Sequence, residues 1–307
     1  MSASLSIVIP AYNEVARLGN TLTAVVNYLR ESWPDAEVIV VDDGSTDNTA
    51  SLAREILNDN SSTLNSSTLN SGTLNSSTLN SSTLNSGTLN SGAHNSGAHN
   101  RDTQNTSTSN SGGLRTSVIT YKSNLGKGRA VRLGLLAARG DVALFSDADL
   151  STPITEAPKL VDPILNGQFD VTFGSRALDR NLIGVHQPWR REQGGRVFNL
   201  AVRLATGLPF WDTQCGFKAF RMTVCRPLVE AATVDRFGFD VELLYLAFRA
   251  GLRLKEVPVR WNHNEGSTVS LASDSFRMLS EVGLIRQQAR RGVYDAAIRA
   301  VHEATKK

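Results

Sequence analysis

Two pairs of acidic residues stand where short apolar stretches of the sequence end. Asp42 and Asp43 follow one stretch, and Asp147 and Asp149 follow another. At an extended strand end, residues i and i+2 point the same way, so the Asp147 and Asp149 carboxylates should face one point. Hard oxygen ligands of this kind select Mg²⁺ or Mn²⁺. The spacing predicts a divalent-metal site at Asp147 and Asp149, whereas a capping turn would already explain one carboxylate of the other pair.

The elements that must position these carboxylates alternate along the chain. Short apolar runs predict buried β-strands at 5–9, 37–41, 117–121, 142–146 and 170–174. Apolar residues at helical spacing between them predict helices at 15–29, 46–57, 128–138 and 154–166. This alternation predicts an α/β fold, Rossmann-like, with a mostly parallel sheet flanked by helices. Ligand chemistry is then expected at the carboxyl ends of the strands.

One segment interrupts this pattern. Residues 61–100 repeat a pentad eight times, and a polar tail continues to residue 113. With so few apolar residues the segment cannot offset its ordering entropy, which predicts a disordered low-complexity insertion at 60–113. A pentapeptide β-helix is the structured alternative. We therefore expect one folded domain made of 1–59 and 114–271, followed by a basic, amphipathic helical region at 272–307.

The basic residues are unevenly spread, although the net charge is only +3. Residues 276–307 hold seven Lys and Arg against three acidic residues, and 115–139 hold six against none. Such stretches favour anionic partners such as phosphates or a lipid surface, with a solvated face as the plainer alternative. The C-terminal region also carries an apolar stripe, which either lies on a lipid surface or packs on its own sheet: Phe276, Leu279, Val282, Ile285, Ala289 and Val293.

Short motifs in a fixed order along the chain resemble those of the family 2 inverting glycosyltransferases of GT-A fold. In the first half these motifs are IVIPAYNE at 7–14, VVDDGS at 40–45, NLGKG at 124–128 and DAD at 147–149. Those of the second half resemble the polyprenyl-phosphate hexosyltransferases, both mannosyl and β-glucosyl: GSR at 174–176, DTQCGFK at 212–218, FDVELL at 239–244 and EGS at 265–267. The DTQCGFK motif is most similar to the dolichyl-phosphate β-glucosyltransferase branch.

The resemblance implies a role for each matching residue. A nucleotide-sugar pocket would be lined by Pro10, Tyr12, Glu14, Asp43, Lys127 and Asp147, with Asp42 in support. Asp149, together with Asp147, would bind the metal ion. The acceptor phosphate would be held by Arg176, Arg191 and Ser267, since arginine meets phosphate oxygens in a bidentate way. Asp240 would be the general base if the acceptor were a hydroxyl.

Two departures from the family pattern bear on the substrate. Ser151 stands where mannosyltransferases often have a metal-binding Gln, and this favours the glucosyl branch. Thr268 stands where Lys commonly follows the Gly-Ser pair, which leaves one acceptor contact open.

The resemblance therefore implies a metal-dependent hexosyltransferase that moves glucose from UDP-glucose to polyprenyl or dolichyl phosphate, with GDP-mannose as another donor. Transfer to a soluble acceptor is one alternative, and nucleotide-sugar binding without turnover is another. Nucleic-acid binding is disfavoured because the acidic strand ends would repel a phosphate backbone. The N-terminus lacks signal-peptide features, no apolar run could span a membrane, and there are only two cysteines. We expect a cytoplasmic protein, with peripheral membrane contact left open.

Overall fold

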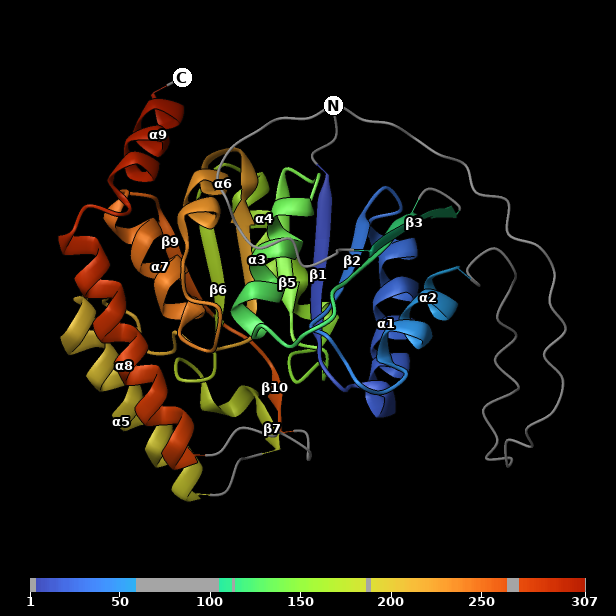
Figure 1. The fold of residues 1–307 in the computed structure, drawn as a ribbon, viewed down its shortest axis with the longest axis horizontal. Coiled ribbons are helices and arrows are strands. Elements are labelled where there is room, and N and C mark those ends of the chain that lie inside the picture. The colour runs from blue at the N-terminus through green and yellow to red at the C-terminus, as the bar shows by residue number, and fades with distance from the viewer. Residues whose placement is uncertain (1–3, 59–104, 112–113, 186–188, 264–270, 307) are drawn as a thin grey trace, which may run out of the picture.

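The computed structural model describes residues 4–58, 105–111, 114–185, 189–263 and 271–306, with the side chains of 105, 109–111, 189–192 and 271–276 left aside. Within these residues, an eight-stranded sheet in the order β3-β4-β2-β1-β5-β8-β6-β9 lies between helices (Figure 1). The α/β fold with a mostly parallel sheet, predicted from the sequence, is confirmed.

The strands are β1 (Leu5–Ala11), β2 (Glu37–Asp42), β3 (Asn105–Ser111), β4 (Leu114–Thr120), β5 (Val142–Ser146), β6 (Val171–Ser175), β7 (Ile183–Val185), β8 (Phe217–Arg221), β9 (Leu254–Pro258) and β10 (Trp261–Asn262). The α-helices are α1 (Val15–Ser32), α2 (Thr49–Asn58), α3 (Lys127–Ala137), α4 (Ala157–Leu165), α5 (Trp189–Thr206), α6 (Met222–Ala231), α7 (Phe239–Arg249), α8 (Leu271–Arg290) and α9 (Asp295–Thr305). Two short 3₁₀ helices are η2 (Ile154–Glu156) and η3 (Arg180–Leu182).

Strand β8 breaks the parallel order inside the sheet, as β3 does at the edge. Strands β4, β2, β1 and β5 are parallel neighbours, and so are β6 and β9. Between them, β8 runs antiparallel to both β5 and β6, with Ser146 opposite Phe217. Its first residue therefore lies beside the last residue of β5. As a result, the chain that leads into β8 reaches the same edge of the sheet as Asp147.

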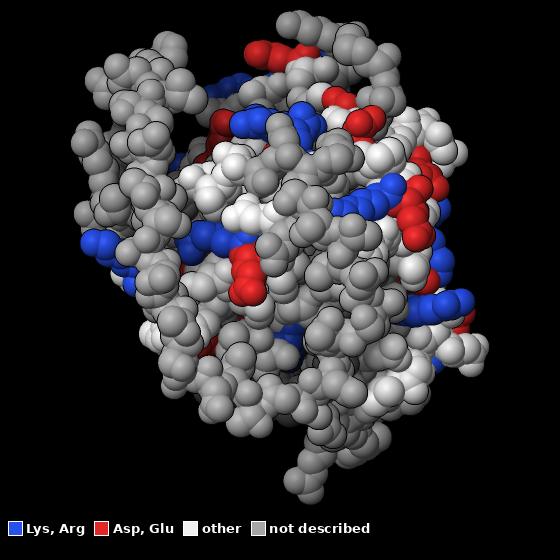
Figure 2. All heavy atoms as spheres, turned by 90° about the vertical axis from the view of Figure 1, so that its right-hand side faces the viewer, with Lys and Arg blue, Asp and Glu red and all other residues white. Residues whose placement is uncertain are grey.

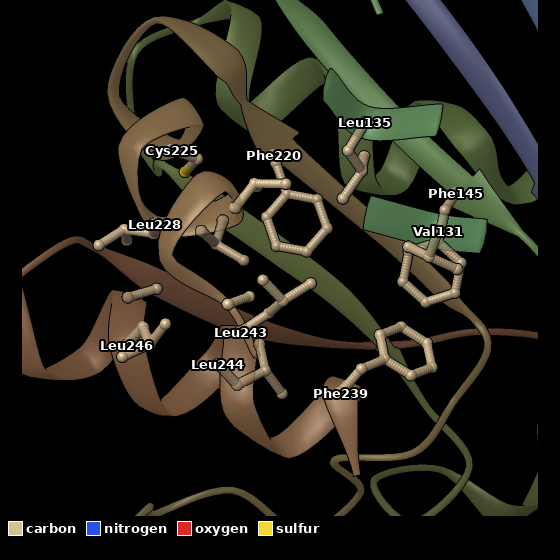
Figure 3. Close-up of a cluster of buried hydrophobic side chains, with 14 of the residues drawn as sticks. Val131, Leu135, Phe145, Phe220, Cys225, Leu228, Phe239, Leu243, Leu244 and Leu246 are labelled. Atoms are coloured by element: carbon tan, nitrogen blue, oxygen red, sulfur yellow. The ribbon is translucent and has the colours of Figure 1, made fainter. Parts of the chain in front are cut away.

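Two apolar clusters, one on each face, hold the sheet and helices together. Alternate side chains of β1 enter different clusters, with Ile7 and Ile9 on the face of α1 and α4 and Val8 on the face of α3 and α6. In Figure 3, Phe220 of β8 and Phe145 of β5 meet side chains of α3, α6 and α7. Each such buried side chain contributes roughly 1.5–3 kcal/mol. The sheet is thus a rigid base for the residues at its strand ends.

The structure differs from the sequence-based expectation at the end of the insertion. Residues 105–111, expected to be disordered, form β3 and pair antiparallel with β4, with Thr108 opposite Ser117. The composition argument was wrong here because an edge strand gains backbone hydrogen bonds from its neighbour and needs no apolar side chain of its own. The pentads at 61–100 lie outside the described residues, and the disorder predicted for them stays a prediction.

The C-terminal apolar stripe packs inside the protein over much of its length. Val282 and Ile285 are fully buried and Ala289 nearly so, and α8 lies along α5 (Figure 1). Leu279 and Val293 are exposed, and the side chain of Phe276 is outside the description. Of the two alternatives for this stripe, packing on the protein itself holds for its central residues. No helix in the described part of the chain is both long and apolar enough to cross a bilayer.

Candidate active site

The loops that follow β1 and β2 are tied to each other. Pro10 is buried in β1, whereas Tyr12, just beyond the strand, is exposed. Asn13 adopts a left-handed backbone conformation, with φ of 53°. Its N–H donates to Ser45 Oγ at 2.9 Å, and the Thr46 N–H donates to Asn13 Oδ1 at 2.9 Å. These bonds hold the two strand ends in one fixed geometry.

Glu14, the third residue assigned to the pocket on this loop, faces its own helix. Its backbone N–H donates to Thr49 Oγ1 at 2.8 Å, and its carboxylate forms an ion pair with Arg17. Glu14 thus lies on the same loop as Tyr12, but its carboxylate is paired with a side chain of the protein itself.

The two carboxylates at the end of β2 have very different surroundings, although both are buried. Asp43 accepts hydrogen bonds from Tyr121 Oη at 2.6 Å, from Asn124 Nδ2 at 3.0 Å, and from the N–H groups of Leu125 and Gly126 at 2.8 and 2.9 Å. Oδ1 of Asp42 has no hydrogen-bond partner among the described residues. Burial raises the pKa of both groups, and these hydrogen bonds oppose the rise at Asp43. Asp43 therefore anchors the 124–126 loop, and Asp42 keeps the unused oxygen.

Lys127 joins that loop to the second acidic pair. It is the first residue of α3, and its Nζ lies 2.6 Å from Asp147 Oδ1. Burial disfavours the charge of Lys127, but the carboxylates of Asp147 and Asp240 keep its pKa above the ordinary value. Gly126, with φ of 112°, is needed here because a Cβ would lie 2.4 Å from the Asp235 carbonyl oxygen. The loop thereby brings a charged ammonium group to the end of β5.

Asp147 and Asp149 occupy a tight turn directly after β5. The Leu150 N–H donates to the Asp147 carbonyl at 3.2 Å, and the Ser151 N–H donates to Asp149 Oδ1 at 2.9 Å. Leu150 takes a left-handed conformation, with φ of 45°, to make this turn. Both aspartates remain partly exposed. Carboxylate oxygens are ligands of the kind that Mg²⁺ and Mn²⁺ prefer, although no group of three or more acidic, His or Cys residues within the described ranges could hold a metal ion.

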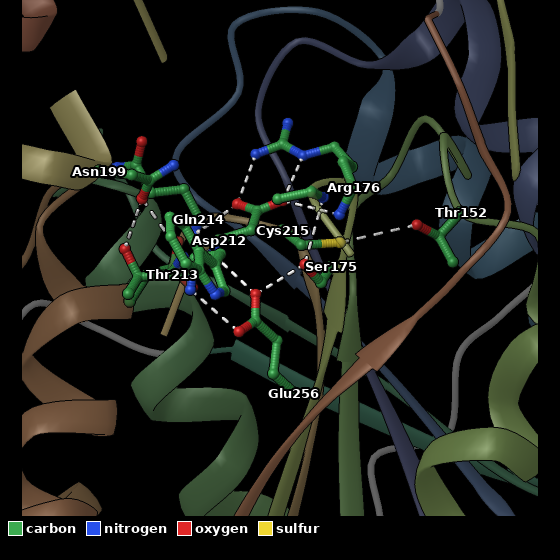
Figure 4. A network of polar contacts seen from close by, with 12 residues as sticks. Thr152, Ser175, Arg176, Asn199, Asp212, Thr213, Gln214, Cys215 and Glu256 are labelled. Carbon is green, nitrogen blue, oxygen red and sulfur yellow. Dashed lines mark hydrogen bonds and ion pairs between the residues drawn. The ribbon is translucent and has the colours of Figure 1, made fainter. Parts of the chain in front are cut away.

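Arg176, at the end of β6, is held on one side by Asp212 (Figure 4). Its Nε and Nη2 donate to the two oxygens of Asp212 at 2.7 and 2.8 Å, and its backbone N–H donates at 3.0 Å. Trp261 covers it, with the guanidinium carbon 5.5 Å from the ring centroid. The Arg176 side chain keeps 28% of its surface exposed. This leaves the outer edge of a preoriented guanidinium facing the site.

Glu256 of β9 supports this pair from below. It accepts hydrogen bonds from Ser175 Oγ at 2.6 Å, from the Asp212 N–H at 2.8 Å and from the Trp211 N–H at 2.9 Å. Because Glu256 binds the backbone of Asp212, it fixes the carboxylate that in turn fixes Arg176.

The Arg176–Asp212 pair should make stability depend on pH. Burial alone would raise the pKa of Asp212, but the Arg176 guanidinium outweighs it and holds the pKa at about 2, below the ordinary 3.8. The lowered pKa of Asp212 thus adds about 2 kcal/mol to the free energy of unfolding above pH 3.8, and this stabilisation is lost as the pH falls towards 2. Urea unfolding from about pH 6 to about pH 2 should show the wild type and Asp212→Asn converging in stability. A difference that stays constant over this range would contradict the assignment.

Asp240 lies in the first turn of α7 and is paired inside the protein. Lys218 Nζ, which is fully buried, lies 2.6 Å from Asp240 Oδ1 and donates to the Cys215 carbonyl at 2.6 Å. Burial raises the pKa of Asp240, and the charges of Lys218 and Lys127 oppose this rise. The carboxylate therefore sits beneath the site, behind Lys127, with little solvent access.

The structure places several of the residues chosen from the sequence at one edge of the sheet. Asp42 ends β2, Asp147 and Asp149 follow β5, Arg176 follows β6, and Lys127 reaches Asp147 from the start of α3. The side chain of Arg191, within α5, and all of Ser267 lie outside the described residues. Sequence reasoning missed the individual roles of Asp212, Gly216, Lys218, Glu256 and Trp261, although three of them stand in the DTQCGFK motif.

The fold and site together define an α/β enzyme that binds its ligand where the parallel strands end. The family described as glycosyl transferase family 2 matches residues 6–66 and 102–228, more than half of the chain. The chain belongs to this family and is a glycosyltransferase. Dolichyl-phosphate beta-glucosyltransferases are similar to it: that of Saccharomyces cerevisiae is 28% identical over 94% of this chain and 76% of its own length, and that of Drosophila melanogaster is 30% identical over 88% and 70%.

Solved structures with the same fold include glucosyl-3-phosphoglycerate synthase from Mycobacterium tuberculosis. Its complex with phosphoglyceric acid gives a TM-score of 0.56, with 18% identity over 94% of this chain and 80% of that one. Its complex with Mn²⁺, UDP and glucosyl-3-phosphoglycerate gives 0.55, with the same identity and coverage. At this identity the likeness concerns the fold, and it confirms the GT-A architecture.

Proposed function

We propose that the protein transfers glucose from UDP-glucose to a polyprenyl phosphate such as dolichyl phosphate, with inversion at the sugar carbon and with Mg²⁺ or Mn²⁺. One observation carries the proposal: the carboxylate turn at Asp147 and Asp149, which follows β5, and the partly exposed Arg176, which follows β6, lie at the same edge of the sheet. The first suits a metal-bound diphosphate, and the second suits an incoming phosphate. The names of the curated relatives support the choice of glucose and dolichyl phosphate.

On the donor side, Asp42 would be the carboxylate that accepts a hydrogen bond from the nucleotide base, because its Oδ1 is buried without a partner among the described residues, whereas every Asp43 oxygen has partners within the protein. Pro10, Tyr12 and Glu14 would border the nucleoside. Asp147 and Asp149 would hold the metal ion, which would neutralise the charge on the departing diphosphate. Lys127, beside Asp147, adds a second positive charge at that point.

On the acceptor side, a phosphate monoester has a second pKa near ~6 and is mostly dianionic at neutral pH. It can attack the sugar carbon without a general base. Arg176 would orient it, and Arg191 and Ser267 are proposed to complete its site. Asp240 remains the candidate base for a hydroxyl acceptor, but its burial and its ion pair with Lys218 favour the phosphate.

A turnover assay tests this function. UDP release should require Mg²⁺ or Mn²⁺, UDP-glucose and a short polyprenyl phosphate together, with GDP-mannose and an acceptor-free reaction as comparisons. Turnover with a soluble sugar or phosphate and none with the lipid would establish the soluble-acceptor alternative instead. Nucleotide binding with no turnover on any acceptor would establish a binding protein.

The charges on one described face of the protein do not favour nucleic-acid binding. On the face in Figure 2, blue and red side chains lie beside one another around the grey atoms, without a continuous basic patch. Ion pairs such as Arg132–Asp235 and Arg253–Asp170 use several of the cations. Binding of a phosphate backbone requires a stripe of Lys and Arg side chains that are not already paired with carboxylates.

Peripheral membrane contact would run through α5 and not through the α8 stripe. Val197, Leu200 and Leu204 are exposed and share one face of α5. Arg203 stacks on the exposed Trp211 nearby, an arrangement suited to a lipid headgroup region. The variant Leu200→Gln/Leu204→Gln should sediment less with phosphatidylcholine–phosphatidylglycerol vesicles, whereas Leu284→Gln, on the exposed side of α8, should behave like the wild type. Equal sedimentation of all three would exclude α5 as the contact.

A further inference from the structure

The motif at 212–218 contacts both halves of the site, Asp147 on one side and Arg176 on the other. It begins six residues after the end of α5, reaches the carboxyl edge of the sheet and enters β8 beside β5. Cys215 and Phe217 are fully buried within it. A segment so tightly packed can hold the residues that it contacts in fixed positions, but it is poorly suited to bind a ligand itself.

Gly216 is the residue of this segment that lies against the donor half. Its carbonyl accepts the Asp147 N–H at 3.0 Å. A Cβ at this position would lie 2.0 Å from Asp147 Oδ2 and 2.2 Å from Asp147 Cγ. The Asp147 carboxylate therefore occupies the space that any larger residue would need. Gly216 does not have a left-handed backbone, so this close approach, and not a turn, explains the need for glycine.

Asp212 is the residue that lies against the acceptor half. It accepts three hydrogen bonds from Arg176 and is itself almost fully buried. The segment between Asp212 and Gly216 is short and well packed, so a displacement of one of these residues would also displace the other. Figure 4 shows Arg176, Asp212 and Glu256 in one network of hydrogen bonds, and Cys215, three residues after Asp212, in contact with Thr152.

We infer that residues 212–218 form a positioning segment that sets the distance between the donor-side carboxylate Asp147 and the acceptor-side cation Arg176. Gly216 makes room for the Asp147 carboxylate, and Asp212 orients Arg176. Neither residue touches a reacting atom. The assignment of the two sides rests on the proposed function.

The variant Gly216→Ala tests the donor side. The added methyl group displaces the Asp147 carboxylate, the free end of a side chain, so the fold should survive. We expect the Kd for UDP in the presence of Mn²⁺ to rise about tenfold and kcat to fall about a hundredfold, while Tm stays near that of the wild type. Gly283→Ala is the matched control, since a Cβ on this α8 residue meets no atom within 4 Å. Unchanged UDP binding and unchanged kcat in Gly216→Ala would overturn the inference.

The variant Asp212→Asn tests the acceptor side. It should raise KM for the polyprenyl phosphate about tenfold and leave KM for UDP-glucose unchanged, because Arg176 loses its orienting charge. Equal losses on donor and acceptor in both variants would show a general structural role and overturn the division of tasks. If the wild type turned over no polyprenyl phosphate, the proposed function would fail, yet UDP binding by Gly216→Ala would still decide the donor half.

Discussion

Replacing Asp149 by asparagine should lower transfer from UDP-glucose by about a hundredfold to a thousandfold while leaving the free energy of unfolding nearly unchanged. Asparagine has the same size, and its amide oxygen can still accept the hydrogen bond that the Ser151 N–H donates to Asp149. What is lost is the negative charge that would hold Mg²⁺ or Mn²⁺ on the diphosphate. The measurement is kcat at saturating UDP-glucose, together with a metal titration of UDP binding.

Asp35→Asn is the matched control for this variant. Asp35 is an exposed carboxylate in the turn between α1 and β2, so its removal changes the net charge equally but away from the site. It should keep wild-type turnover. Full activity in Asp149→Asn, with an unchanged response to Mn²⁺, would remove Asp149 from the metal site.

Replacing Lys218 by methionine should cost about 3–5 kcal/mol of stability. Methionine fills nearly the same volume, but it leaves the buried Asp240 carboxylate without the ammonium group 2.6 Å away. Removal of one partner of a buried pair costs more than the pair contributes, because the remaining charge is uncompensated. Urea unfolding at neutral pH measures the change, and Lys255→Met, at an exposed position on β9, should cost less than about 1 kcal/mol.

A double variant separates the charge from the packing. Lys218→Met/Asp240→Asn removes both charges and should recover most of the stability lost in Lys218→Met. A double variant as unstable as the single one would mean that Lys218 contributes through shape or through its bond to the Cys215 carbonyl.

The sequence could predict the strand ends because their determinants are local. Apolar runs such as those before Asp43 and Asp147 bury on both faces of a parallel sheet, and their spacing alone places the carboxylates at one edge. Strand β8 could not be predicted in this way. Its sequence, FKAFR, contains Lys218, whose burial depends on Asp240 in another element.

The difference in hydrogen bonding between Asp42 and Asp43 was equally beyond local reasoning. Both follow the same strand and both are buried. Only the approach of Tyr121 and the 124–126 loop, some eighty residues later in the chain, decides which carboxylate is satisfied within the protein. The roles of Glu256 and Gly216 could not be predicted either, because they depend on contacts with segments that are distant in the sequence.

The pentad tract leaves the described structure at the end of α2 and returns at β3, and these two elements contact each other at one edge of the sheet. Arg176 follows β6, near the opposite edge. Five residues correspond to fifteen nucleotides, so gain or loss of a whole pentad during DNA replication keeps the reading frame. Since the tract is attached through α2 and β3 at this edge, we expect such length variants to leave the strand ends that carry Asp147 and Arg176 in place.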